Sequence, residues 1–137
     1  MAEGKGWRTA RLGEIPTTND PSYWEEWARD PGYGASWRSI RPFFGITSFG
    51  VNAYEAGAGE ELVVPHDEKD FGGQEELYFI ARGRARFICD GQEVEVAEGG
   101  LLYARPEVMR EARALETPTI VFMVGGVPGV FSAGENL

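Results

Sequence analysis

The alternation of apolar and polar residues is clearest in residues 84–96, where it predicts a β-hairpin. Two alternating runs flank Asp90-Gly91, and Asp-Gly between such runs favours a two-residue turn. This turn sets the register of the two strands, with the pairs Phe87–Val94, Ala85–Val96, Cys89–Gln92 and Arg86–Glu95. One face of the hairpin is then apolar, with Cys89 as part of the core, and the other carries an ion pair between the strands.

Six further strands are expected, each a short apolar or alternating segment bounded by turn residues. They cover residues 44–54, 61–65, 76–81, 100–104, 110–114 and 119–124. Short strands at close spacing with regular turns are typical of a β-sandwich or a small barrel. No segment after Pro31 keeps a helical period over ten residues, which argues against parallel βαβ units.

Residues 1–36 follow a different pattern from the rest of the chain. They are mostly irregular, but a short helix is predicted over residues 20–30, because Asp20 suits the N-cap and Pro21 the first helical position. We therefore divide the chain into an N-terminal arm with one short helix and a β domain over residues 37–137.

Composition excludes several classes of function. The chain has 137 residues, enough for one well-packed core, and its net charge of −9 repels phosphate backbones, so no nucleic-acid partner is expected. A single cysteine excludes an internal disulfide framework and fits a reducing compartment. Neither a secretory signal nor an apolar stretch of about 20 residues is visible, so we expect a cytoplasmic protein with no membrane partner.

Two motifs resemble those of the cupin superfamily. Glu76, followed after six residues by Gly83 and a hairpin, is similar to the end of the first cupin motif, and residues 64–68 resemble its start. Gly100, followed after five residues by Pro106, resembles the first half of the second motif. The resemblance covers most of the chain and is to small bacterial single-domain cupins of unassigned function. It implies an all-β fold, a small double-stranded β-helix or jelly-roll barrel.

The metal-ligating pattern of that family is incomplete here. Cupin metal sites usually take two histidines and a glutamate from the first motif and a histidine from the second, but His66 is the only histidine of the chain. Glu68 stands two residues after it, and counting from Pro106 places Glu111 at the second-motif histidine position. Such a set suits Mn, Mg or Ca better than softer ions. We therefore expect no tightly bound transition metal; a divalent ion, if bound, would be held by His66, Glu76 and Glu111.

The resemblance also places Glu76 in the barrel interior. Period-2 counting puts Glu76 on the same face as Tyr78, and a buried carboxylate needs a metal, a cation or hydrogen-bond donors. Tyr78, Gln74, an arginine or a bound ligand are the candidate partners. Seven residues separate Glu68 from Glu76, where the family has three or four. We expect this longer loop to hold His66 and Glu68 too far from Glu76 to share one ion.

Three functions stay open at this point. The first is binding of an unidentified small molecule in the barrel, at a degenerate, metal-poor pocket. Its candidate residues are His66, Glu68, Gln74, Glu76, Tyr78 and Glu111. The second is a metal-dependent cupin enzyme, such as a dioxygenase, isomerase or lyase, with a carboxylate-rich site. The third is an inert structural or oligomerisation module. The single histidine favours the first.

Ordinary structural roles also remain open for the same residues. His66 would then be a loop histidine that forms local hydrogen bonds, and Glu111 a solvated strand residue paired with Arg110 or Arg113. Whatever the ligand, an unpaired strand edge and a tryptophan-rich arm are liabilities on a small monomer. We therefore predict a homodimer.

Overall fold

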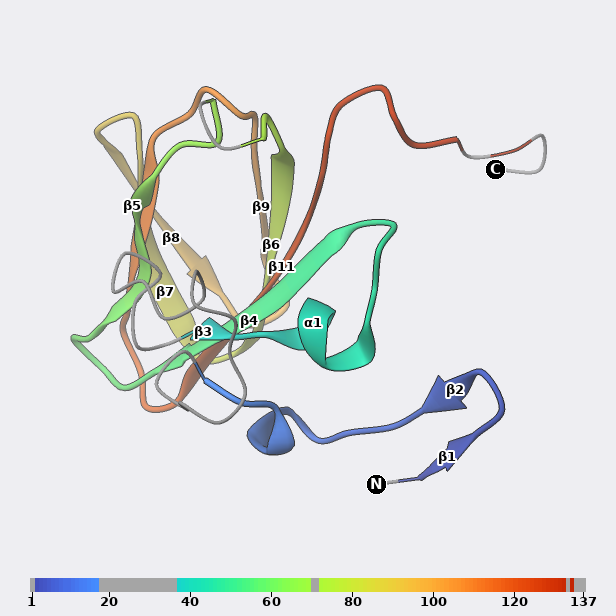
Figure 1. The fold of residues 1–137 in the computed structure, drawn as a ribbon. Helices are drawn as coiled ribbons and strands as arrows, with labels where there is room; N and C mark the ends of the chain where they lie inside the picture. Colours follow the sequence, from blue (N-terminus) through green and yellow to red (C-terminus); the bar gives the residue numbers. More distant parts are fainter. Residues whose placement is uncertain (1, 18–36, 70–71, 133, 135–137) are drawn as a thin grey trace.

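The computed structural model describes residues 2–17, 37–69, 72–132 and 134, and most of them lie in β-strands (Figure 1). The main strands follow one another along the chain as β4 (Gly50–Ala56), β5 (Glu61–His66), β6 (Glu75–Arg82), β7 (Arg84–Cys89), β8 (Gln92–Ala97), β9 (Leu101–Ala104), β10 (Arg110–Ala114) and β11 (Thr119–Gly126). The shorter elements are β1 (Glu3–Gly4), β2 (Trp7–Arg8), a 3₁₀ turn (Leu12–Glu14), β3 (Trp37–Arg38) and the helix α1 (Ile40–Phe44). Within these residues, no helix is long and apolar enough to cross a membrane.

Two antiparallel sheets face each other and enclose the core, which confirms the predicted all-β barrel. One sheet has the order β5-β10-β7-β8 and the other β3-β4-β11-β6-β9. Their inner faces meet in a continuous apolar cluster that includes Tyr54, Ile80, Phe87 and Val121. The Tyr78 and Phe87 rings pack edge to face across this interior with centroids 5.4 Å apart. Burial of these side chains supplies the main driving force for closing the barrel.

The predicted register of the β7–β8 hairpin is confirmed for every pair. Asp90 and Gly91 both have positive φ, 48° and 82°, as a hairpin turn with two left-handed positions requires. The predicted ion pair is wrong in its partner, however: Glu95 binds Arg84, its diagonal neighbour, and not Arg86 directly opposite. Strand twist brings diagonal positions within reach of long side chains, and this explains the exchange.

The turn from β6 into β7 explains one glycine of the first cupin-like motif. Gly83 has a φ of 79°, and a Cβ added there would lie 2.7 Å from the carbonyl oxygen of Pro118. Any larger residue would therefore clash with the chain that enters β11. Gly83 permits β6 and β7 to separate into the two sheets at this point.

The expected strand over residues 44–54 is wrong in its first half. Phe44 is the last residue of α1, residues 45–49 form an irregular connection, and β4 begins only at Gly50. Gly45 ends the helix in the left-handed conformation, with a φ of 71°, and its N–H caps the last turn. The helix predicted over residues 20–30 lies outside the described residues, so it and the domain division at residue 36 stay predictions.

The N-terminal segment packs on the outer face of the five-stranded sheet. Ile15 is buried there with Ile40 of α1 and Ala53 of β4. Arg38 fastens the segment by donating from Nη1 to the Ile15 carbonyl oxygen at 2.9 Å. The outer face of this sheet is therefore covered on its β4 side, and the β1–β2 hairpin extends away from the barrel (Figure 1).

Candidate functional site

Five polar side chains meet inside one end of the barrel, and we call them the polar cluster: His66, Glu68, Glu76, Tyr78 and Arg110. His66 ends β5 and is the cross-strand neighbour of Arg110 on β10. Glu76 and Tyr78 come from β6, in the opposite sheet. The cluster therefore joins the two sheets through side-chain contacts.

Glu76 is the centre of the polar cluster. Its side chain is 2% exposed, and the Tyr78 hydroxyl donates to Oε1 at 3.0 Å. His66 Nε2 lies 3.4 Å and Arg110 Nη2 3.6 Å from the same oxygen. The carboxylate thus has a hydroxyl and two basic groups around it, which is how a buried negative charge is stabilised.

The loop between Glu68 and Glu76 brings His66 and Glu68 close to Glu76, although the sequence predicted that they would lie apart. His66 Nε2 lies 3.4 Å from Glu68 Oε1, so both reach Glu76, and the expected displacement is wrong. Backbone hydrogen bonds hold the loop: Glu68 N–H donates to the Pro106 carbonyl oxygen at 2.9 Å, and Gly73 N–H to that of Glu68 at 2.8 Å. These two bonds fix the position of Glu68, and the approach of His66 and Glu68 to Glu76 is maintained.

His66 is held as a cation by its surroundings. Its Nδ1–H donates to the Val64 carbonyl oxygen at 2.8 Å, which leaves Nε2 facing the two carboxylates. Burial alone lowers the pKa of His66, but hydrogen bonds with Glu68, Glu76 and Val64 outweigh it and raise the pKa from 6.5 to about 9. At neutral pH the His66 imidazole is therefore protonated beside Glu68 and Glu76.

Two further groups in this region are kept protonated. Burial, followed by the negative charge of Glu76, raises the pKa of Tyr78 well above 10, so its hydroxyl remains a donor. Cys89 is the cross-strand neighbour of Arg110 and packs against the core, as its place in the hairpin predicts. Burial raises the pKa of the Cys89 thiol despite the nearby Arg110 charge, so a reactive thiolate is disfavoured.

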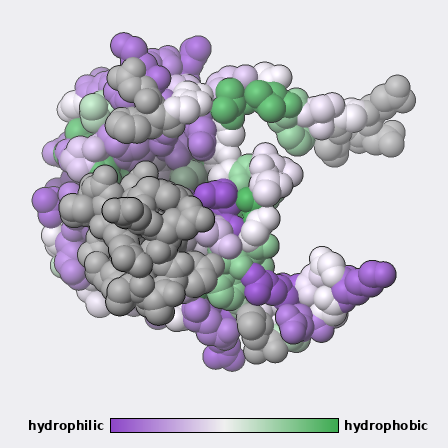
Figure 2. All heavy atoms as spheres, viewed as in Figure 1, coloured by the Kyte–Doolittle hydropathy of each residue, from purple (hydrophilic) through white to green (hydrophobic). Residues whose placement is uncertain are grey.

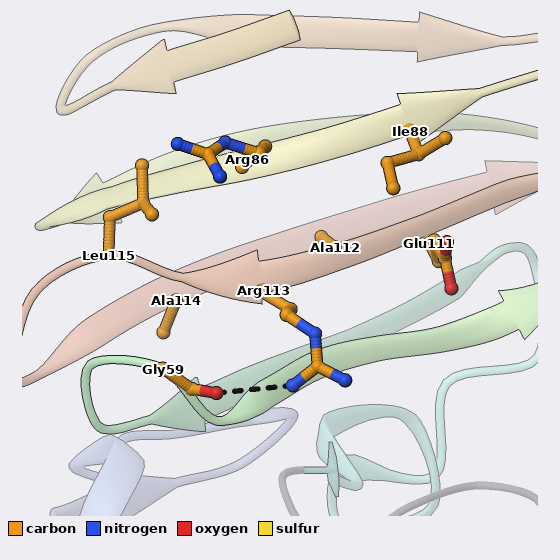
Figure 3. Close-up of a pocket in the computed structure, with 8 residues that line it drawn as sticks. All are labelled: Gly59, Arg86, Ile88, Glu111, Ala112, Arg113, Ala114 and Leu115. Carbon is orange, nitrogen blue, oxygen red and sulfur yellow. Dashed lines mark hydrogen bonds between the residues drawn. The ribbon is translucent and has the colours of Figure 1, made fainter. Parts of the chain in front are cut away.

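The structure reverses the expected roles of two neighbours in β10. Glu111 does not face the interior: it lies on the outer face of the four-stranded sheet, opposite Ile88. There it borders a shallow cavity of about 240 Å³ (Figure 3), in which Arg113 Nη1 donates to the Gly59 carbonyl oxygen at 3.1 Å. The cavity is lined by Gly59, Arg86, Ile88, Glu111, Ala112, Arg113, Ala114 and Leu115.

Arg110 occupies the interior position instead, and its side chain is fully buried. Nη2 donates to the Arg105 carbonyl oxygen at 3.3 Å, whereas Nε and Nη1 have no hydrogen-bond partner among the described residues. A sequence signal for this placement exists. Alternation along β10 puts Arg110 on the same face as Ala112 and Ala114, the small residues that pack against the core. Counting the cupin-like motif from Pro106 selects Glu111, which is one residue after Arg110, the residue that faces the interior.

Asn52 is a second interior residue that the sequence reasoning missed. It lies on β4 with the same orientation as Tyr54 and pairs with Met123, both core residues. Its Oδ1 is buried without a hydrogen-bond partner in the described part of the chain. Gln74 is half-buried close to Glu76: a Cβ added at Gly125, the cross-strand neighbour of Glu76, would be 2.8 Å from the Gln74 Oε1.

The polar cluster contains a donor set that fits a divalent ion. The nearest ligand atoms of His66, Glu68 and Glu76 lie within 4.8 Å of one another. Ligand atoms about 2.1 Å from one ion are roughly 3.0–3.4 Å apart, close to the two 3.4 Å separations of His66 Nε2. Glu68 thus replaces Glu111 in the predicted ligand set. An ion here would have to displace the Nε2 proton and would lie near Arg110.

Comparison with solved structures identifies the fold. A cupin protein from Bacteroides fragilis gives a TM-score of 0.59 at 23% identity, covering 68% of this chain and 77% of that protein. A putative sugar phosphate isomerase from Acidithiobacillus ferrooxidans gives 0.56 at 13% identity, covering 65% of this chain but only 56% of that protein. The plu4264 protein from Photorhabdus luminescens gives 0.54 at 13% identity, covering 65% and 72%.

No protein-family model and no curated protein matches the sequence. At these identities, structural likeness establishes the fold and not the reaction. The two motifs and the two-sheet barrel agree with these matches, and the chain therefore has the all-β cupin fold.

Proposed function

We propose that this chain binds a small, oxygen-rich organic molecule at the polar cluster. The observation that carries the proposal is the fully buried Arg110 guanidinium, whose Nε and Nη1 lack hydrogen-bond partners among the described residues. Unpaired buried donors are costly, and an acceptor oxygen of a ligand would satisfy them. Asn52 Oδ1 also lacks a hydrogen-bond partner among the described residues, and it offers an acceptor on the sheet opposite that of Arg110.

The exposed fractions of the side chains support entry of a ligand from the end of the barrel where His66 and Glu68 lie. Their side chains are 22% and 15% exposed, whereas those of Glu76 and Arg110 are almost completely buried. A ligand entering here meets His66 and Glu68 first. Carboxylates accept hydrogen bonds from hydroxyl groups, and the basic groups donate hydrogen bonds to carboxylate or hydroxyl oxygens. A hydroxy acid or a sugar therefore matches the chemistry.

A thermal-shift panel tests this proposal. We expect at least one member of a set of hydroxy acids and monosaccharides to raise the melting temperature of the wild-type protein. Arg110→Lys, verified as folded by circular dichroism, removes the guanidinium fork and is expected to abolish the shift. Arg86→Lys is the matched control, because Arg86 lies on the outer face of the sheet. Equal shifts in the wild type and Arg110→Lys would place binding elsewhere.

A divalent-metal site is the second candidate, favoured by the convergence of His66, Glu68 and Glu76. A bound ion would supply Lewis-acid polarisation of a ligand oxygen. Mn²⁺ must compete with the proton on His66, so its affinity should depend on pH. Below a pH near 9 we expect the affinity to rise by as much as about tenfold for each pH unit. Calorimetric titration with Mn²⁺ measures it, with His66→Ala expected to lose binding and Glu111→Gln to keep it.

These experiments also separate the remaining alternatives. Ligand shifts without Mn²⁺ binding support the metal-poor binding protein. Mn²⁺ binding that strengthens a ligand shift supports a metal-dependent enzyme. Absence of both in the folded wild-type protein supports an inert structural module.

A further inference from the structure

The chain leaves β11 at the same end of the barrel as the polar cluster. Gly125 and Gly126, the last two residues of β11, pair with Glu76 and Glu75. The residues that follow therefore begin beside the centre of the polar cluster. Figure 1 shows the chain continuing beyond the end of the barrel where β5 ends and β6 begins, and then turning outward. We call residues 127–132 the C-terminal segment.

The C-terminal segment is apolar and uncovered. Val127, Val130 and Phe131 are 48%, 74% and 80% exposed. None of the six residues of the segment is charged, although the chain has a net charge of −9. Figure 2 shows this segment projecting with its apolar side chains clear of the barrel and with open space beneath it. Apolar side chains gathered in one exposed stretch favour a contact surface.

The backbone of the C-terminal segment is a local turn joined to the barrel by glycine. Gly129 follows Pro128 and has a φ of 82°, as the third position of a type II turn requires. Val130 N–H closes the turn by donating to the Val127 carbonyl oxygen at 3.3 Å, and no hydrogen bond joins these residues to the barrel in the described part of the chain. Gly126 precedes the turn, and the conformational freedom of glycine suits a hinge there.

The C-terminal segment is long enough to cross the mouth of the barrel. Phe131 is five residues beyond Gly126, so it can reach at most about 17 Å from it. Facing sheets lie about 10 Å apart, which sets the width to be crossed. His66 and Glu68, with side chains 22% and 15% exposed, lie at this opening.

From this arrangement we infer that the C-terminal segment is a lid that closes over the polar cluster around a bound ligand, with Gly126 as its hinge. The structure contains the open position. Closure would place Val130 and Phe131 over the ligand and exclude water, which strengthens the polar contacts of the buried groups. A ligand that the lid contacts binds the closed form more tightly and shifts the equilibrium toward it. The inference rests on the proposed function for its ligand.

Disulfide trapping of the full-length chain tests the lid without any ligand. Lys69→Cys, at the exposed residue after Glu68, is combined with Ser132→Cys and with Cys89→Ala, which removes the native thiol. Ala58→Cys replaces Lys69→Cys in the matched control, because Ala58 is exposed in the turn between β4 and β5, at the opposite end of the barrel. Circular dichroism verifies the fold of each variant, and mass spectrometry after alkylation follows the loss of free thiols under mild oxidation.

We expect the Lys69→Cys variant to form an intramolecular disulfide at least about tenfold faster than the Ala58→Cys control, because closure raises the effective concentration of the two thiols. Adding Phe131→Ser should slow this reaction several-fold, since it removes the largest apolar side chain of the lid. Equal rates in the two cysteine pairs would overturn the lid. A disulfide formed between two chains would overturn it as well, because the segment would then pack on another molecule.

The two proposals for this end of the barrel fail in different ways. A fast disulfide together with a thermal-shift panel that finds no ligand supports the mobile lid and contradicts the proposed binding function. A ligand whose shift depends on Arg110, together with equal disulfide rates in the two pairs, supports the binding function and overturns the lid alone.

Discussion

Two sets of opposite charges in this barrel differ in their surroundings. Glu76 and Arg110 meet inside it and are almost completely buried, whereas Arg84 and Glu95 meet on the outside of the β7–β8 hairpin with nearly half of each side chain exposed. Water solvates the outer pair whether or not it forms. The inner charges lose that solvation on folding and depend on one another, on His66 and on Tyr78. Similar residue types therefore have different consequences for stability and for ligand binding.

Removing one inner charge should have the largest effect. Arg110→Met leaves the Glu76 carboxylate buried with one basic partner fewer, and we expect a loss of about 3 kcal/mol in the free energy of unfolding. Urea denaturation at neutral pH measures it. Arg110→Met combined with Glu76→Leu should recover much of the loss, since both charges are then absent. A single variant as stable as the wild type would contradict the dependence of Glu76 on Arg110.

The pH dependence of stability reports the same cluster through His66. Because the pKa of His66 is raised from 6.5 in the unfolded chain to about 9 in the folded one, its contribution is complete below pH 6.5. It is then lost as the pH rises to about 9, and we expect a decrease of about 2–3 kcal/mol. Urea denaturation between these pH values tests this, and His66→Gln should flatten the dependence. A decrease of equal size in His66→Gln would assign it to other groups.

The outer pair should give the smallest effect. Glu95→Gln removes its contact with Arg84, and we expect a change of at most about 1 kcal/mol in unfolding free energy. Added salt should reduce even this difference, because exposed charges are screened. Thermal denaturation at low and high salt measures both. A loss as large as that of Arg110→Met would remove the contrast between the two sets.

Much of the candidate site could be predicted from local pattern. Alternation along β6 put Glu76 and Tyr78 on one face, and the cupin resemblance placed that face inside. The cupin-like spacing brought His66 and Glu68 into consideration. Arg110 was missed because a family motif was counted across an irregular connection, although Ala112 and Ala114 mark the inner face of the same strand. The outward position of Glu111 follows from the same alternation.

The sequence by itself determined the features that depend on residues close in the chain. Asp90-Gly91 set the hairpin register, and Gly83 permitted the sharp change from β6 to β7, since both act through the backbone conformation of a few residues. Only the tertiary structure decided that Glu68 joins His66 at Glu76. That approach depends on a hydrogen bond to Pro106 and on the pairing of β5 with β10, contacts between segments about 40 residues apart that no local pattern encodes.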